Sequence, residues 1–186
     1  FVRGRSWSVA EGAGCNVPEI SMNIRCSGTH TECAGHLLDQ DSDVSACMKN
    51  FLMSAILVTI NPQHFGGCPD RYHAGIGDNE SVISADRFFR EYKRWVMSEP
   101  DALIIRTEPN PEEKQFYKYS VHPAPFFTNG AMSMICDTPI KHLIVDLPSV
   151  DRMSDDGILG NHRIFWGDGL NPECEVNPES EKTITE

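Results

Sequence analysis

The sequence lacks a long hydrophobic run and has few positive charges. Its longest apolar stretch is Ser54-Ala55-Ile56-Leu57-Val58-Thr59-Ile60, far short of the ~20 residues that a membrane-spanning helix needs. The 16 lysines and arginines are outnumbered by 27 aspartates and glutamates, so the formal net charge is −11. Such a chain repels nucleic-acid phosphates and anionic lipid headgroups. We therefore expect neither nucleic-acid binding nor a membrane role.

A disulfide framework is also missing. The seven cysteines are odd in number and scattered along the chain, which fits reduced thiols better than a disulfide-stapled fold. No secretory signal pattern opens the sequence. We therefore expect a reducing, cytoplasmic setting.

Internal repeats, low-complexity stretches and a Pro/Gly-rich linker are absent from the 186 residues. A chain of this length with 40% apolar residues can bury one hydrophobic core. The sequence therefore predicts a single domain spanning 1–186.

Strand patterns are present in four places. Short apolar runs rich in β-branched residues predict buried strands, whereas strict alternation of apolar and polar residues predicts a half-buried one. The three apolar runs are 56–60, 102–105 and 143–145, and the alternating segment is 19–25.

Helix patterns lie between these strands. Aromatic and aliphatic residues at helical spacing predict a helix at 85–97, with Ser84 as its N-cap, and a shorter helix is predicted at 129–135, capped by Thr128. Alternation of strands and helices favours an α/β domain. The segment 168–180 is rich in proline, glycine and acidic residues, which predicts an exposed loop.

Histidine, glutamate and cysteine residues cluster in the segment Cys26-Ser27-Gly28-Thr29-His30-Thr31-Glu32-Cys33-Ala34-Gly35-His36. Imidazole, carboxylate and thiol groups can all coordinate a transition metal. In extended backbone, His30 and Glu32 project to the same face and could reach one ion. Gly28 permits a tight turn that would let Cys26 or His36 join them. The segment therefore predicts a metal site.

Two stretches of the sequence share their pattern with one known family. The first is Gly28-Thr29-His30 with Glu32 and His36, and the second is Leu143-Ile144-Val145-Asp146-Leu147-Pro148-Ser149-Val150-Asp151 followed by Asn161-His162-Arg163. Together they resemble the signature of the metal-dependent cyclase family, which includes bacterial kynurenine formamidase. The resemblance implies a compact α/β domain with a mixed β-sheet flanked by helices, the swivelling β/β/α fold. It also implies self-association into dimers or tetramers.

The resemblance assigns roles to residues of both motifs. It implies that His30 and Glu32 bind the metal, and that His162 is a further metal ligand on a downstream strand. His36 is implied to be the catalytic residue that transfers protons. Because relatives carry an additional N-terminal strand, and because Glu186 falls within a ligand strand, we expect the sequence to be part of a longer chain.

Two positions of the implied ligand set leave alternatives. Glu186, on a strand expected at 182–186, corresponds to the family's last ligand, and Glu173 or Glu175 in the preceding loop could take its place. Cys26 stands where the common family pattern has a metal-binding histidine. A thiolate there would favour zinc over manganese, and without it fewer protein groups would hold the ion. We expect a divalent metal, zinc in preference to manganese.

The resemblance implies a metal-dependent hydrolase that uses metal-activated water on a small amide. The implied substrate is an N-formyl arylamine such as N-formylkynurenine, an intermediate of tryptophan catabolism, or a related cyclic amide. Phe126, Phe127 and Trp166 flank the motifs and are candidates for lining a pocket that holds a ring-bearing substrate.

Two other functions stay open at this point. One is a binding or regulatory protein that keeps the fold without turnover. The other is a thiol hydrolase with Cys26 as nucleophile and His30 or His36 as base.

Overall fold

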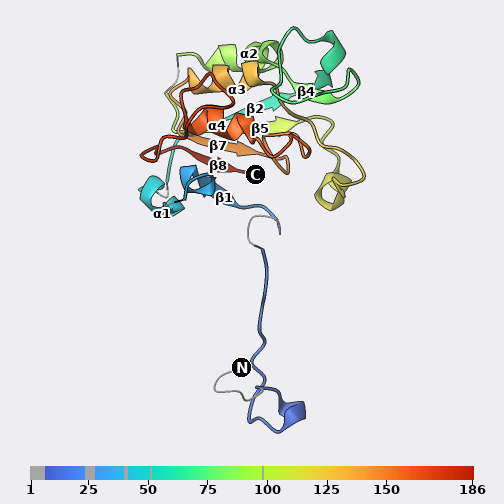
Figure 1. The fold of residues 1–186 in the computed structure, drawn as a ribbon, viewed down its shortest axis with the longest axis vertical. Coiled ribbons are helices and arrows are strands. Elements are labelled where there is room, and N and C mark those ends of the chain that lie inside the picture. Colours follow the sequence, from blue (N-terminus) through green and yellow to red (C-terminus); the bar gives the residue numbers. More distant parts are fainter. Residues whose placement is uncertain (1–6, 24–27, 40–41, 51, 98) are drawn as a thin grey trace.

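The computed structural model describes residues 7–23, 28–39, 42–50, 52–97 and 99–186, which form two β-sheets and the helices around them (Figure 1). The strands are β1 (Thr31–Cys33), β2 (Ala55–Ile60), β3 (Gln63–His64), β4 (Ser81–Ile83), β5 (Ala102–Thr107), β6 (Phe126–Phe127), β7 (His142–Val145) and β8 (Thr183–Thr185). The α-helices are α1 (Val44–Cys47), α2 (Ala85–Tyr92), α3 (Asn129–Cys136) and α4 (Gly160–Trp166). Short 3-10 helices are η1 (Val9–Glu11), η2 (Ala34–His36), η3 (Phe65–Gly67), η4 (Lys93–Trp95) and η5 (Glu112–Phe116).

The larger sheet has five strands in the order β1-β8-β7-β5-β2. Strands β8, β7, β5 and β2 run parallel to their neighbours, and β1 adds an antiparallel edge beside β8. A smaller sheet has the order β3-β4-β6. The mixed sheet flanked by helices confirms the α/β fold class predicted from the sequence.

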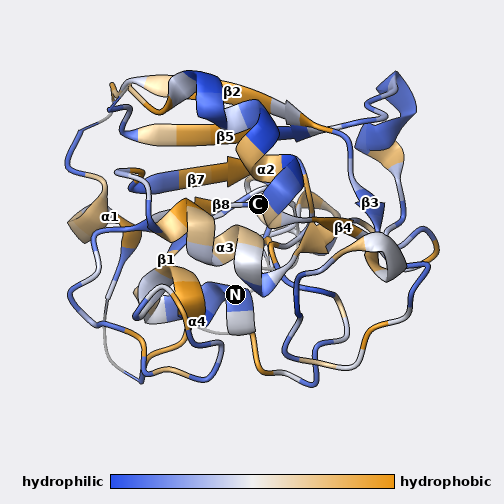
Figure 2. Cartoon of the chain, turned by 90° about the horizontal axis from the view of Figure 1, so that it is seen from above, coloured by the Kyte–Doolittle hydropathy of each residue, from blue (hydrophilic) through white to orange (hydrophobic). Residues whose placement is uncertain are grey.

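Helices α2 and α3 cover one face of the larger sheet, and α4 lies beside α3 (Figure 2). Ile56, Val58 and Leu103 are buried beneath them. The three apolar runs do form strands, but β2 is not buried on both faces, because the side chain of Leu57 is 48% exposed on the opposite face. No helix in the described ranges is both long enough and apolar enough to span a bilayer.

Both predicted helix caps are confirmed. The hydroxyl oxygen of Ser84 accepts a hydrogen bond from the backbone N–H of Arg87 at 3.3 Å, and that of Thr128 accepts one from Ala131 at 3.1 Å. Helix α2 ends earlier than predicted, at Tyr92, and continues only as η4. The apolar positions beyond it do not extend the buried face, since Val96 is 56% exposed and Met97 is 95% exposed.

The strand predicted at 19–25 is wrong over its described part. Residues 19–23 form no strand, and Ile20 and Met22 are 82% and 58% exposed. They belong to an N-terminal segment that runs away from both sheets (Figure 1). Alternation specifies a strand only where a neighbouring strand and a core cover one face, and the described residues offer this segment neither. The remainder of the predicted strand, 24–25, lies outside the described residues.

The segment predicted as an exposed loop at 168–180 contains neither helix nor strand, but it is not exposed throughout, because Val176 is buried in the larger hydrophobic cluster. It begins with a turn in which Asp168 accepts hydrogen bonds from the backbone N–H groups of Leu170 and Asn171, each at 2.8 Å. The loop leads into β8, one of the strands that hold the candidate site.

Candidate metal centre

The edge of the larger sheet brings three chemically active side chains onto one face. Thr31 of β1 pairs with Thr185 of β8, and the ladder continues past the ends of both strands. The backbone N–H of His30 donates to the carbonyl of Glu186 at 3.0 Å, and that of Glu186 donates to the carbonyl of His30 at 3.1 Å. Residues opposite one another in a ladder share a face, as do residues two apart in one strand. His30, Glu32 and Glu186 therefore point the same way.

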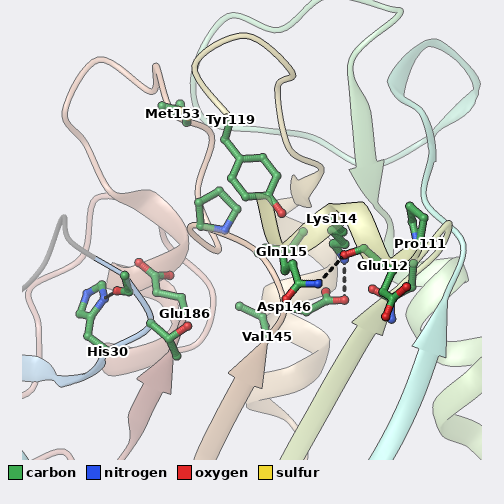
Figure 3. A pocket seen from close by; sticks show the side chains of 15 residues that line it. His30, Pro111, Glu112, Lys114, Gln115, Tyr119, Val145, Asp146, Met153 and Glu186 are labelled. Atoms are coloured by element: carbon green, nitrogen blue, oxygen red, sulfur yellow. Dashed lines mark hydrogen bonds and ion pairs between the residues drawn. The ribbon is translucent and has the colours of Figure 1, made fainter. Parts of the chain in front are cut away.

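These three side chains are close enough to share one cation. A ring nitrogen of His30 and one carboxylate oxygen each of Glu32 and Glu186 all lie within 4.8 Å of one another. Figure 3 shows His30 and Glu186 side by side at the wall of a cavity. The other glutamates considered for the last ligand, Glu173 and Glu175, are exposed in the loop and belong to neither candidate cluster of the described residues.

His162 reaches this centre from the first turn of α4, and not from a strand as expected. Its Nε2 atom lies 2.9 Å from a carboxylate oxygen of Glu32 and 3.7 Å from one of Glu186. The side chain is only 1% exposed. Helix α4 starts at Gly160, where an added Cβ would lie 2.4 Å from the ring of His73. Only glycine allows the helix to begin so close to that ring.

Asp151 fixes the orientation of His162. One of its carboxylate oxygens lies 2.7 Å from Nδ1 of His162, and the same carboxylate accepts the backbone N–H groups of Asn161 and His162. The hydroxyl of Tyr72 donates to its other oxygen at 3.0 Å. With Nδ1–H donating to Asp151, the opposite ring nitrogen faces Glu32, as in metal-binding histidines held by a carboxylate. Asp151 belongs to the second sequence motif, and its role as a partner of His162 becomes evident only in the fold.

His36 lies beside the centre at the end of η2. Its Nδ1 atom is 3.5 Å from Glu32, and its side chain is 23% exposed. The ring also approaches those of His162 and Trp166, with centroid separations of 5.9 and 6.4 Å. The structure thus places the predicted proton-transfer residue next to the predicted ligands.

The charges of the centre shift the pKa values of its buried groups. Burial alone would raise the pKa of Glu32, but His162, His36 and His30 around it hold this pKa below its usual value. Burial would lower the pKa of His162, yet Asp151, Glu186 and Glu32 raise it well above its usual value. The cluster therefore favours negative charge on the glutamate and positive charge on the imidazole.

A divalent cation fits this donor set. Both carboxylate oxygens of Glu32 and the Nε2 atom of His162 are buried without a hydrogen-bond partner among the described residues. Nε2 and Glu32 form an ion pair at 2.9 Å when the imidazole is protonated, but no hydrogen bond joins them. Each unpaired buried polar group costs about 1–3 kcal/mol, and a cation bound by carboxylate and imidazole would satisfy all three atoms. Cys26, the other expected ligand, lies outside the described residues.

A second cluster, formed by His73, Asp151 and Asp155, differs in its hydrogen bonding. The ring of His73 contacts the backbone N–H of Gly160 at 3.3 Å and the side chain of Asn129 at 3.0 Å. Asp155 accepts the backbone N–H groups of 157 and 159. These groups are already paired, and what they hold in place is the start of α4 and, with it, His162.

A cavity of about 970 Å³ opens beside the centre. Gly28, Thr29, His30 and Glu186 line it at the end next to the candidate metal centre. The aromatic residues expected to line a pocket do not line this cavity. Phe127 and Phe126 form β6, which pairs with the central strand β4 of the smaller sheet, and they are buried in the larger and smaller hydrophobic clusters, respectively. Trp166 is 1% exposed, and the centroid of its ring lies 5.4 Å from the centroid of the His162 ring, against which it packs.

Metal binding is expected to release a proton from His162. Its pKa is raised, so at neutral pH a proton on Nε2 competes with the cation. The affinity for Zn²⁺ should therefore rise with pH until the pH passes this raised pKa, and calorimetry in buffers of different ionisation enthalpy should show a net proton release near pH 7. The same titration with the His162→Gln variant should show none of this release, and binding without proton release in the wild type would contradict the assignment.

Comparison with known proteins adds three findings. The family model described as "Putative cyclase" matches residues 5–152, a range that ends before His162 and Glu186. A "Kynurenine formamidase" of Bacillus cereus is 24% identical over 160 residues, which cover 86% of this chain and 65% of the formamidase. The solved structure of a "Potential Metal-Dependent Hydrolase With Cyclase Activity" superposes with a TM-score of 0.52 at 14% identity and covers 90% of this chain and 64% of that one. The chain thus spans just under two thirds of the length of each relative.

Proposed function

The chain belongs to the cyclase family, and on this premise we propose that it is a metal-dependent hydrolase of small amides. The observation that carries the proposal is the set of three buried, unpaired polar atoms on Glu32 and His162 beside a cavity of about 970 Å³. His30, Glu32, Glu186 and His162 would hold the ion, zinc in preference to manganese. When bound, such an ion polarises the carbonyl of the amide and lowers the pKa of its water toward ~7.

The residues of the chain provide the remaining steps. Glu32 and Glu186 supply negative charge, and Asp151 holds the ring of His162 in place. His36 accepts a proton from the attacking water and returns it to the nitrogen of the leaving amine as the carbon–nitrogen bond breaks. For a formamide, the products are the amine and formate.

The substrate that we propose is an N-formyl arylamine of the N-formylkynurenine type, with a cyclic amide as the alternative within the same chemistry. The similarity to a kynurenine formamidase supports this choice. The volume of the cavity, about 970 Å³, is also ample for a ring-bearing molecule. Self-association, a cytoplasmic location and a single domain over 1–186 stay predictions.

Removal of the metal tests the proposal. Exhaustive chelation should abolish formanilide hydrolysis, and Zn²⁺ or Mn²⁺ added back should restore it, as measured by formate release together with elemental analysis. Activity that survives complete metal removal would contradict the metal mechanism and favour a thiol hydrolase. A fully metal-loaded protein that hydrolyses neither formamides nor cyclic amides would favour a binding protein.

A matched pair of histidine variants tests the site. His30→Ala should lose both bound metal and activity, because His30 is one of the three groups within 4.8 Å. His64→Ala should keep both, because His64 is exposed on β3, in the smaller sheet. A His30→Ala protein with full metal content and full activity would rule out this site.

A further inference from the structure

The cavity has a second polar end, away from the metal centre. Lys114, Tyr119 and Asp146 line it there, and Val145, Leu147 and Pro148 provide apolar wall along β7 and the turn that follows (Figure 3). The mechanism proposed above uses none of these side chains. Lys114 is the only lysine or arginine in the described wall of the cavity.

Asp146 holds Lys114 in position, and the hydrogen bonds of Asp146 occupy both of its carboxylate oxygens. Nζ of Lys114 lies 2.5 Å from Asp146, and the ammonium group also donates to the hydroxyl of Thr107 at 2.7 Å. Asp146 further accepts the backbone N–H of Thr107 at both oxygens and its hydroxyl at 2.9 Å. Both oxygens of the carboxylate are thus hydrogen-bonded, and what the pair can still offer an anionic ligand is a donor.

The ammonium group keeps one such donor. Lysine carries three N–H bonds, and the third contact of Lys114, to the carbonyl of Thr107, is long at 3.5 Å. Its side chain is 12% exposed, so the group is largely withdrawn from bulk water yet lines the cavity. A charged donor in such a setting binds an anionic oxygen more strongly than one in open solvent does.

Tyr119 adds a second donor. Its hydroxyl points toward the side of the cavity where Lys114 and Asp146 lie (Figure 3), and it has no hydrogen-bond partner within the described residues. Burial and the nearby charge of Asp146 raise the pKa of this phenol, so the hydroxyl stays protonated and able to donate.

We propose that Lys114 and Tyr119 bind a carboxylate of the substrate while its amide lies at the metal centre. The inference rests on the proposed function and sharpens it: the preferred substrates are amides that carry a carboxylate, separated from the scissile bond by an apolar part that packs on Val145 and Leu147. Glu112 also lines the cavity and would favour a cationic substituent instead, so the test includes one.

Three substrates of the metal-loaded enzyme test this preference: formanilide, a formanilide with a ring carboxylate, and one with a ring aminomethyl group. The carboxylate should lower KM about tenfold or more relative to formanilide, the size expected for a hydrogen bond to a charged group. Lys114→Met should remove this advantage, Tyr119→Phe should reduce it, and both should leave the KM for formanilide unchanged. Lys118→Met, which alters an exposed lysine on the same segment, should keep the wild-type pattern.

Several results would overturn the proposal. These are equal KM values for the carboxylated and plain substrates, a preference for the aminomethyl substrate, or an equal loss for all three substrates in Lys114→Met. Calorimetric binding of benzoate to the metal-loaded protein separates this proposal from the proposed function. Binding that Lys114→Met weakens about tenfold supports the carboxylate site even if no amide is hydrolysed, and binding that the variant leaves unchanged refutes it.

Discussion

Replacement of Glu32 by glutamine is expected to abolish stoichiometric metal binding and to lower amide hydrolysis by at least about three orders of magnitude. The carboxylate of Glu32 is 3% exposed and lies between His30, His36 and His162. Glutamine keeps the shape but removes the negative charge that a cation requires at the centre. A thousandfold loss corresponds to about 4 kcal/mol of transition-state stabilisation, within the several kcal/mol that a metal ion can contribute.

Elemental analysis and formate release measure the two parts of this prediction, and circular dichroism establishes that the variant is folded. The matched control is Glu175→Gln, since Glu175 is an exposed glutamate that the sequence offered as an alternative ligand. It should retain metal and activity. If Glu32→Gln bound one equivalent of metal as tightly as the wild type, Glu32 would not be a ligand.

The second large effect is expected for Asp151→Asn, which should weaken metal binding by about 10- to 100-fold, the usual range for a partner of a metal-binding histidine. Asparagine can still accept the backbone N–H groups at the start of α4. It lacks the charge that holds His162 with its Nδ1 proton directed away from the centre. Competition with a chromogenic chelator measures the affinity, and catalytic rate should be compared at saturating metal.

Asp155→Asn is the control, because Asp155 accepts the backbone N–H of Leu159, the residue just before the same helix, and lies near His73 but is not paired with His162. Both variants should lower the melting temperature, whereas Asp151→Asn alone should lower metal affinity. An equal loss of affinity in the two variants would mean that Asp151 acts only by stabilising α4.

Local patterns predicted those parts of the fold that depend on local physics. The apolar runs became β2, β5 and β7, and Ser84 and Thr128 cap the helices that follow them. The caps depend on residues within the same helical turn, and an apolar run needs only a hydrophobic core to be buried in. The alternating segment 19–25 failed because a strand also needs a partner, which its own sequence does not specify.

The family resemblance predicted His30, Glu32, His162 and Glu186 as metal ligands. The structure brings all four side chains together. Their binding of a metal stays a prediction. Two other residues, Asp151 beside His162 and Lys114 in the cavity wall, were not found in the same way. Asp151 acts through contacts with Tyr72 and His162, and Lys114 through contacts with Asp146 and Thr107. Tyr72 lies 79 positions from Asp151, and Asp146 lies 32 positions from Lys114, so only the folded chain reveals these two contacts. A signal was available in Asp146 and Asp151, the two aspartates of the second motif.

The pairing of β1 with β8 has a consequence for the order of folding. It joins Thr31 to Thr185, which are 154 positions apart, so the loop that must close is among the longest the chain can form, and its closure is entropically costly. We therefore expect the face that carries His30, Glu32 and Glu186 to assemble after the intervening strands have formed their sheet. An ion held there would act as a crosslink between distant segments. Because the ion would bind only when β1 is paired with β8, it would raise the free energy of unfolding in proportion to the logarithm of the ion concentration.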